Sequence, residues 1–167
     1  DDPLLLDDAE PLPARVAARL RASLPGPLAD LAGLCAVVGE VFAAEEISGI
    51  LDQPVSYPIG ELDPGAALFR LVRMGILEPR AGTGFASAST ALADALAASL
   101  PAGVRRQHHD AALRFLLASG RTNEPALHRI ARHATANEFA EEAHSAHFAL
   151  AMTAKGHGRL KAAAHHL

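Results

Sequence analysis

The stretch 63–88 constrains the fold most, because it carries helix start, helix stop and turn signals in a fixed order. Asp63 can cap a helix whose first residue is Pro64, where no amide hydrogen is needed. Apolar residues at helical spacing follow, and Gly75 ends the helix because glycine tolerates the left-handed conformation. A short extended run and the turn at 81–84 then reverse the chain. The stretch therefore predicts a helix that leads directly into a β-hairpin.

The residues before this stretch predict three more helices and one strand. The first helix begins at Pro13, and Gly39 ends the second. The strand Glu40-Val41-Phe42 is predicted to pair with the later hairpin, ahead of a third helix that starts near Glu45. We expect the first helix to face the core with residues that recur every fourth position: Leu12, Val16 and Leu20. This order of elements is typical of a winged helix-turn-helix with one extra helix, spanning 12–88 behind a linker at 1–11.

Beyond residue 88 the pattern changes to one helix after another. Ser89 or Thr90 can cap the first, Pro101 begins the next, and Asn123 starts a third. Alanine-rich helices joined by short turns predict an antiparallel, tetratricopeptide-like array, although the period is kept too poorly for a true repeat. We therefore assign 89–167 to the start of an α-helical repeat region, in a chain that is mostly α.

The amino-acid composition also favours a mostly α-helical fold, and it limits the functions that we expect of the chain. Aromatic residues are only 4% of the chain, so the core must be built mainly from Ala, Leu and Val, which favours packed helices. The net charge of −4 gives no global attraction to DNA or to anionic lipid. Cys35 is the single cysteine and lies in an apolar run, which predicts a buried structural thiol in a reducing, cytoplasmic setting. No signal peptide or membrane-spanning run is found.

Three stretches together resemble bacterial signal-transduction ATPases of the STAND type, such as the large ATP-binding regulators of the LuxR type. The stretch 11–51 resembles the segment that follows their nucleotide-binding core, and LFRLVRMGILEPRAGTGF at 68–85 is similar to their winged-helix hairpin. The stretches 99–116 and 127–143 are similar to the start of their helical array. One departure is that Phe85 is followed by ASASTALADAL, where relatives often carry a His and an Arg.

The resemblance implies a regulatory segment of a longer chain, without catalytic residues of its own. A phosphate-binding loop needs a glycine-rich turn that ends in Lys and Ser or Thr. The only lysines are Lys155 and Lys161, and neither follows such a loop. We therefore expect no enzyme activity and no cofactor in this segment. ATP, the ATPase domain of the same chain and a partner or effector on the helical array are implied for the parent protein.

The helix and hairpin offer two candidate interaction sites. An apolar outer face suits docking to protein, and we expect this patch to contain Phe69, Met74 and Leu77. The alternative is a DNA-binding transcription factor, whose recognition helix and wing would use Arg70, Arg73 and Arg80. A recognition helix usually exposes several polar side chains to read base edges, and this one does not. Protein docking is therefore the leading hypothesis.

The sequence contains nine histidines, but it gives little support for a metal site or for a hydrolytic enzyme. His144 and His147 are spaced to share one helix face, and His128 and His133 lie one helix earlier. The adjacent pairs 108–109 and 165–166 diverge on a helix and chelate poorly. A triad can be written from Ser89, Asp94 and His108, but no G-x-S-x-G turn supports it. We expect surface or helix-interface histidines and no metal.

Overall fold

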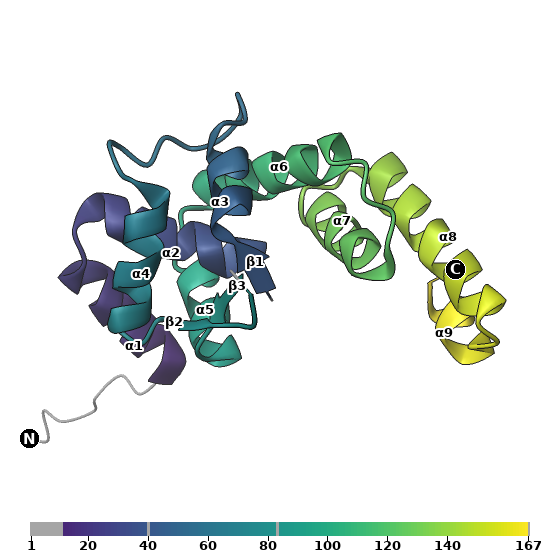
Figure 1. Cartoon of the computed structure of the whole chain (residues 1–167), viewed down its shortest axis with the longest axis horizontal. Helices are drawn as coiled ribbons and strands as arrows, with labels where there is room; N and C mark the ends of the chain where they lie inside the picture. Colours follow the sequence, from purple (N-terminus) through teal and green to yellow (C-terminus); the bar gives the residue numbers. More distant parts are fainter. Residues whose placement is uncertain (1–11, 40, 83, 167) are drawn as a thin grey trace, which may run out of the picture. The chain divides into compact units, whose positions relative to one another are not determined.

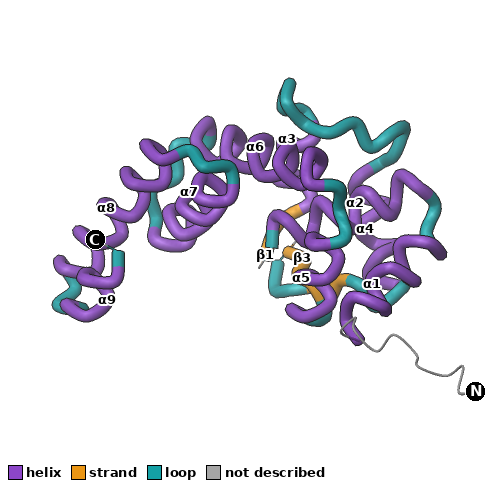
Figure 2. Tube along the Cα trace, turned by 180° about the vertical axis from the view of Figure 1, so that it is seen from behind, coloured by secondary structure: helices purple, strands orange, loops and turns teal. Residues whose placement is uncertain are grey.

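The computed structural model describes residues 12–39, 41–82 and 84–166, and over these residues the chain is mostly helical with a small three-stranded antiparallel sheet (Figure 1). The expected linker at 1–11, Glu40 of the first strand and Thr83 of the turn lie outside the described residues. Figure 2 shows how little of the trace is strand. The expectation of a mostly α chain is confirmed.

The chain divides into two compact units, Asp1–Ser48 with Pro58–Arg105, and Gly49–Tyr57 with Arg106–Leu167. The division does not fall at residue 88, where the composition changes, because the helix that follows packs on the first two helices. The elements are α1 (Leu12–Ser23), α2 (Gly26–Val38), β1 (Val41–Ala43), α3 (Ala44–Leu51), α4 (Pro64–Arg73), β2 (Leu77–Pro79), β3 (Gly84–Ser87), α5 (Thr90–Ala98), α6 (Ala102–Ala118), α7 (Glu124–Ala136), α8 (Ala140–Gly156) and α9 (Leu160–His165).

Helix α2 is the centre of the first unit. It is apolar around nearly its whole circumference, and α1, α4 and α5 all pack against it. A helix of this kind can only be stable when it is covered on every side. Its one charged residue, Asp30, lies 3.5 Å from the guanidinium of Arg21 on α1. Cys35 is fully enclosed, as expected, and its burial raises the pKa of the thiol far above the ordinary value.

Helix α1 packs with a different face from the one expected. Leu12 and Val16 are 71% and 46% exposed, and the buried residue of the helix is Ala17. The small side chain of Ala17 lets α1 approach α2 and α5 closely, and the distance between packed helices depends on the side chains at the contact. The expectation that Leu12 and Val16 face the core is therefore wrong, whereas Leu20, three residues after Ala17, is half-buried.

The helix and hairpin predicted at 63–88 are confirmed in detail. The Oδ1 atom of Asp63 accepts a hydrogen bond from the Gly65 amide at 3.0 Å, and Pro64 is the first residue of α4. Gly75 has a φ of 70°, and its amide donates to the Val72 carbonyl at 2.9 Å. The next amide reaches back five residues to the Leu71 carbonyl, which completes a Schellman motif. The helix stop therefore leads straight into β2.

The sheet has the order β1-β3-β2, with both pairs antiparallel. Val41–Ala43 does pair with the hairpin, which confirms the strand predicted there as far as it is described. Phe42 lies opposite Phe85, and their rings stack with centroids 6.4 Å apart. Both rings are buried, so this pair joins the outer strand to the core of the unit.

In the described part of the second unit, the regular elements are all helices. Its core is formed where α6, α7 and α8 meet, by Leu113, Leu116, Leu127, Ile130, Ala134 and Leu150 among others. Asn123 caps α7 as predicted, with its Oδ1 accepting from the Ala126 amide at 3.0 Å. Arg159, before α9, forms a two-pronged ion pair with Glu124 at the start of α7, at 3.0 and 2.8 Å. None of the helices in the described residues is long and apolar enough to cross a membrane.

We expect Gly49→Ala to destabilise the protein by about 1–3 kcal/mol, because the added methyl group would overlap the ring of Phe115 on α6. Gly103→Ala, at a helical position with nothing within 4 Å, is the control and should raise stability by roughly 0.5–1 kcal/mol. Urea denaturation followed by circular dichroism measures both. Equal effects from the two variants would contradict the close packing of Gly49 on Phe115.

Candidate functional site

The outer surface of α4 is the candidate site in the first unit. Helix α4 is amphipathic: Ala67, Leu68 and Leu71 are buried against the unit. Phe69, on the opposite side, is 63% exposed, and Met74, the residue that caps the end of the helix, is 43% exposed. The exposed arginines of the helix lie beside them, Arg70 and Arg73. The surface therefore combines apolar and cationic groups.

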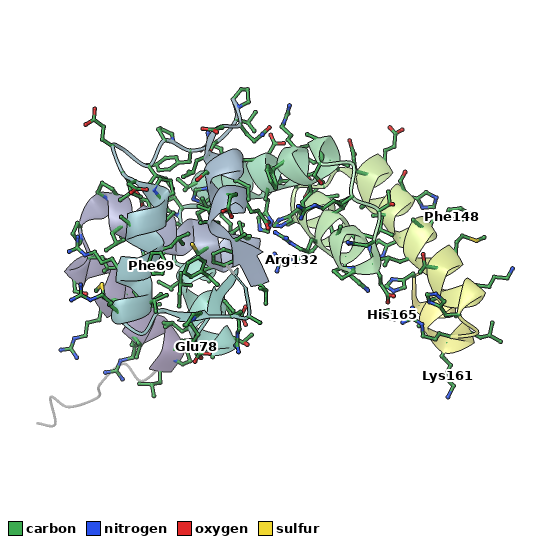
Figure 3. All side chains as sticks on the ribbon, viewed as in Figure 1. Phe69, Glu78, Arg132, Phe148, Lys161 and His165 are labelled. Carbon is green, nitrogen blue, oxygen red and sulfur yellow. The ribbon has the colours of Figure 1, made fainter. Side chains whose placement is uncertain are left out.

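The ring of Phe69 is exposed but held in place. It meets the ring of Phe85 edge to face, with centroids 5.6 Å apart and planes at 80°. Phe85 in turn stacks on Phe42, so three aromatic rings run from the outer side of α4 through β3 to β1. Figure 3 shows Phe69 on the ribbon of α4, in the first unit. Edge-to-face pairs of aromatic rings are favourable, so the contact with Phe85 stabilises the orientation in which Phe69 is exposed.

Two hollows lie along α4. One, of about 560 Å³, is lined by Ala66, Phe69, Arg70, Arg73 and Met74. The other, of about 350 Å³, shares Ala66 and Arg70 with the first and continues to the start of α2. Glu61 and Asp63 line this second hollow, so the surface along α4 carries both signs of charge.

Leu77, the third residue expected in the exposed patch, is buried. It is only 2% exposed, because β2 pairs with β3 and alternate side chains of a strand point to opposite faces. Glu78 is on the outer face instead. The alternation apolar-polar at 77–78 is the signal in the sequence that could have shown this. The expectation that Leu77 is exposed is wrong, and the patch consists of Phe69 and Met74.

The three arginines of the alternative site do not share one surface feature. Arg70 and Arg73 line the same hollow on α4. Arg80, on the hairpin, is exposed and forms an ion pair with Glu78, at 3.2 Å. Glu78 thus offsets the charge that Arg80 would offer to a phosphate.

Several histidines pair across helices rather than along them. His133 on α7 lies 2.9 Å, Nδ1 to Nδ1, from His109 on α6, and His147 on α8 lies 3.3 Å from His166 beyond α9. These partners are far apart in the sequence, and no spacing rule could have found them. Within the described residues, no group of three or more His, Cys, Asp or Glu side chains could hold a metal ion.

The members of the triad written from the sequence have ordinary structural surroundings. The Oγ atom of Ser89 accepts from the Leu92 amide at 3.4 Å and caps α5. His108 is fully buried in the second unit, where the ring of Tyr57 meets it edge to face at 6.0 Å. Ser89 and His108 belong to different units, and Asp94 is exposed on α5.

Because His133 is buried, we expect the protein to lose stability in acid. Burial lowers the pKa of His133 well below its usual value, and the charges of Arg132, His109 and Arg129 lower it further. The unfolded chain binds a proton there near pH 6.5, but the folded chain resists it, so the stability present above about pH 6.5 is lost as the pH falls. Urea midpoints measured between about pH 7 and pH 5 should show this loss.

His133→Leu should make that dependence shallower, because no titrating group remains at the position, while His166, whose pKa burial also lowers, still contributes. His144→Gln is the matched control, since His144 is exposed on α8. This control should keep the acid loss of the unaltered chain. An unchanged slope in His133→Leu would contradict the role given to His133.

Comparison of the chain with protein-family models, with curated proteins and with solved structures finds no match in any of the three.

Proposed function

We propose that this chain is a non-catalytic regulatory and protein-interaction segment of a multidomain, ATPase-type transcriptional regulator in the bacterial cytoplasm. In this proposal the first unit carries a winged-helix domain, to which α5 also belongs, and the helices of the second unit begin a tetratricopeptide-like array that binds a partner or effector. Two features of the fold support it: α4 leads directly into the β2–β3 hairpin, and the second unit is a succession of packed helices.

The observation that carries the proposal is the exposed apolar surface on α4. Most of the Phe69 ring stays exposed after folding, and exposed apolar patches rimmed by polar groups mark interaction sites. Here Phe69 is fixed by Phe85 and lies beside Met74 in a hollow rimmed by two arginines. Aromatic and arginine side chains are enriched at the centres of protein interfaces. The surface is therefore suited to docking another protein domain.

The proposed partner is the nucleotide-binding core that the resemblance implies within the same polypeptide. A domain that presses on Phe69 also acts on Phe85 and Phe42, and so on the sheet. Through these rings the nucleotide state of the core would reach the first unit. ATP belongs to that core in this proposal, because the chain carries no phosphate-binding loop of its own.

DNA binding is the second candidate, and the observation in its favour is the pair Arg70 and Arg73 in one hollow. The neighbouring acids weigh against it. Glu61 and Asp63 line the adjoining hollow, and Glu78 pairs with Arg80. Carboxylates at these places repel a phosphate backbone, whereas a protein surface of mixed charge can complement both signs.

Phe69→Asp should weaken association with the nucleotide-binding core at least about tenfold, because a buried aromatic contact is replaced by a charge that must be desolvated. The coding sequence before residue 1 is read first, for a glycine-rich loop ending in Lys-Ser or Lys-Thr. Biolayer interferometry of that core against this chain then measures the affinity. Leu12→Asp, at another exposed apolar residue, is the control. Equal affinity in both variants, or no such loop upstream, contradicts the proposal.

Titration with mixed-sequence duplex DNA at low salt separates the two candidates. The docking proposal predicts no binding in fluorescence anisotropy. A DNA-binding domain would instead bind with an affinity that falls steeply as salt rises, since phosphate contacts release counterions. In that case the triple variant Arg70→Ala, Arg73→Ala, Arg80→Ala would lose the binding, and the docking proposal would be wrong.

A further inference from the structure

Helix α8 has two apolar faces, and only one of them is covered. The inner face is buried against the rest of the second unit, by Ala146, Leu150, Ala151 and Ala154. The outer face carries Phe148 and Met152, each 52% exposed. Phe148 lies on the side of α8 away from α7 (Figure 3). An apolar pair one helical turn apart on an exposed face is typical of a helix that packs against a second helix.

The apolar pair is part of a longer stripe with a charge at each end. Glu141, Ser145, Phe148, Met152 and Lys155 follow one another at spacings of four, three, four and three residues, so they share one face of α8. All five are exposed. Within the described part of the chain, neither Glu141 nor Lys155 forms an ion pair.

The stripe is symmetric about Phe148. Glu141 lies seven residues before this ring and Lys155 seven residues after it, about 10 Å along the helix in each direction. If a second α8 is laid antiparallel across the first with Phe148 at the two-fold axis, each Glu141 faces the Lys155 of the other copy. The two Phe148 rings meet in the middle, each Met152 lies against His144 and Ser145 of the other copy, and the two helix dipoles run in opposite directions. The surface is thus complementary to itself.

We propose that the outer face of α8 is a homodimer interface, in which two copies of this chain pair antiparallel about Phe148. Glutamate in the first turn and lysine in the last turn also complement the dipole of a single helix. That reading leaves the exposed Phe148 and Met152 between them without a role. One helix face from each copy is small for an interface, so the dimer is weak and forms reversibly with concentration.

Sedimentation equilibrium of the whole 167-residue chain tests the pairing. The average mass should rise from 17.4 kDa toward twice that value as the concentration increases. Phe148→Glu should abolish the rise, because it places two like charges at the axis. Leu12→Glu, at an exposed apolar residue of the first unit, is the control and should leave the rise unchanged. Circular dichroism verifies that both variants keep their helix content.

Charge reversal tests the antiparallel register independently. Glu141→Lys and Lys155→Glu should each weaken the dimer roughly fivefold to tenfold, because each change creates two repelling contacts. An equal mixture of the two variants should dimerise again, and so should the chain with both changes.

Three results would overturn the proposal: a monomer at every concentration, a dimer that persists in Phe148→Glu, or a double variant that fails to recover. The first would show that the exposed stripe does not recognise itself. The second would place self-association on another surface. The third would exclude the antiparallel register.

Discussion

The first unit depends on covering α2 on all sides. The side chains of this helix are almost all apolar, so exposing the helix to water would be unfavourable in free energy. Three helices supply the cover, and each meets α2 with small or branched apolar side chains rather than with aromatic rings. The chain has few aromatic residues, and its helices fill the core by packing closely instead of through bulky side chains.

Local signals of helix start and stop could be predicted from the sequence more securely than the side of each element that is covered. Asp63, Gly75 and Asn123 act through hydrogen bonds and backbone angles of their own neighbourhood, and the structure has them as predicted. Which side of a helix or strand is covered depends on the partner that packs there. Leu12 is exposed because Ala17 makes the contact, and Leu77 is buried because β2 joins β3.

In the candidate sites, too, some features could be predicted from the sequence and others could not. The exposure of Phe69 could be predicted from the helical pattern alone, because α4 is short and strongly two-sided. The edge-to-face contact that fixes Phe69 needed the strand order, since Phe85 lies on the middle strand. The pairing of His133 with His109 joins helices whose mutual packing no local pattern encodes. Residues were therefore easier to predict than their partners.

The Schellman motif after α4 also sets which parts of the hairpin can change in length. Leu77 follows Gly75 by two residues, and its inward direction depends on that count. One extra residue in this turn would exchange the two faces of β2 and carry the carboxylate of Glu78 into the core, where a charge is costly. Natural variants of the chain should therefore keep a constant number of residues at the junction between α4 and β2.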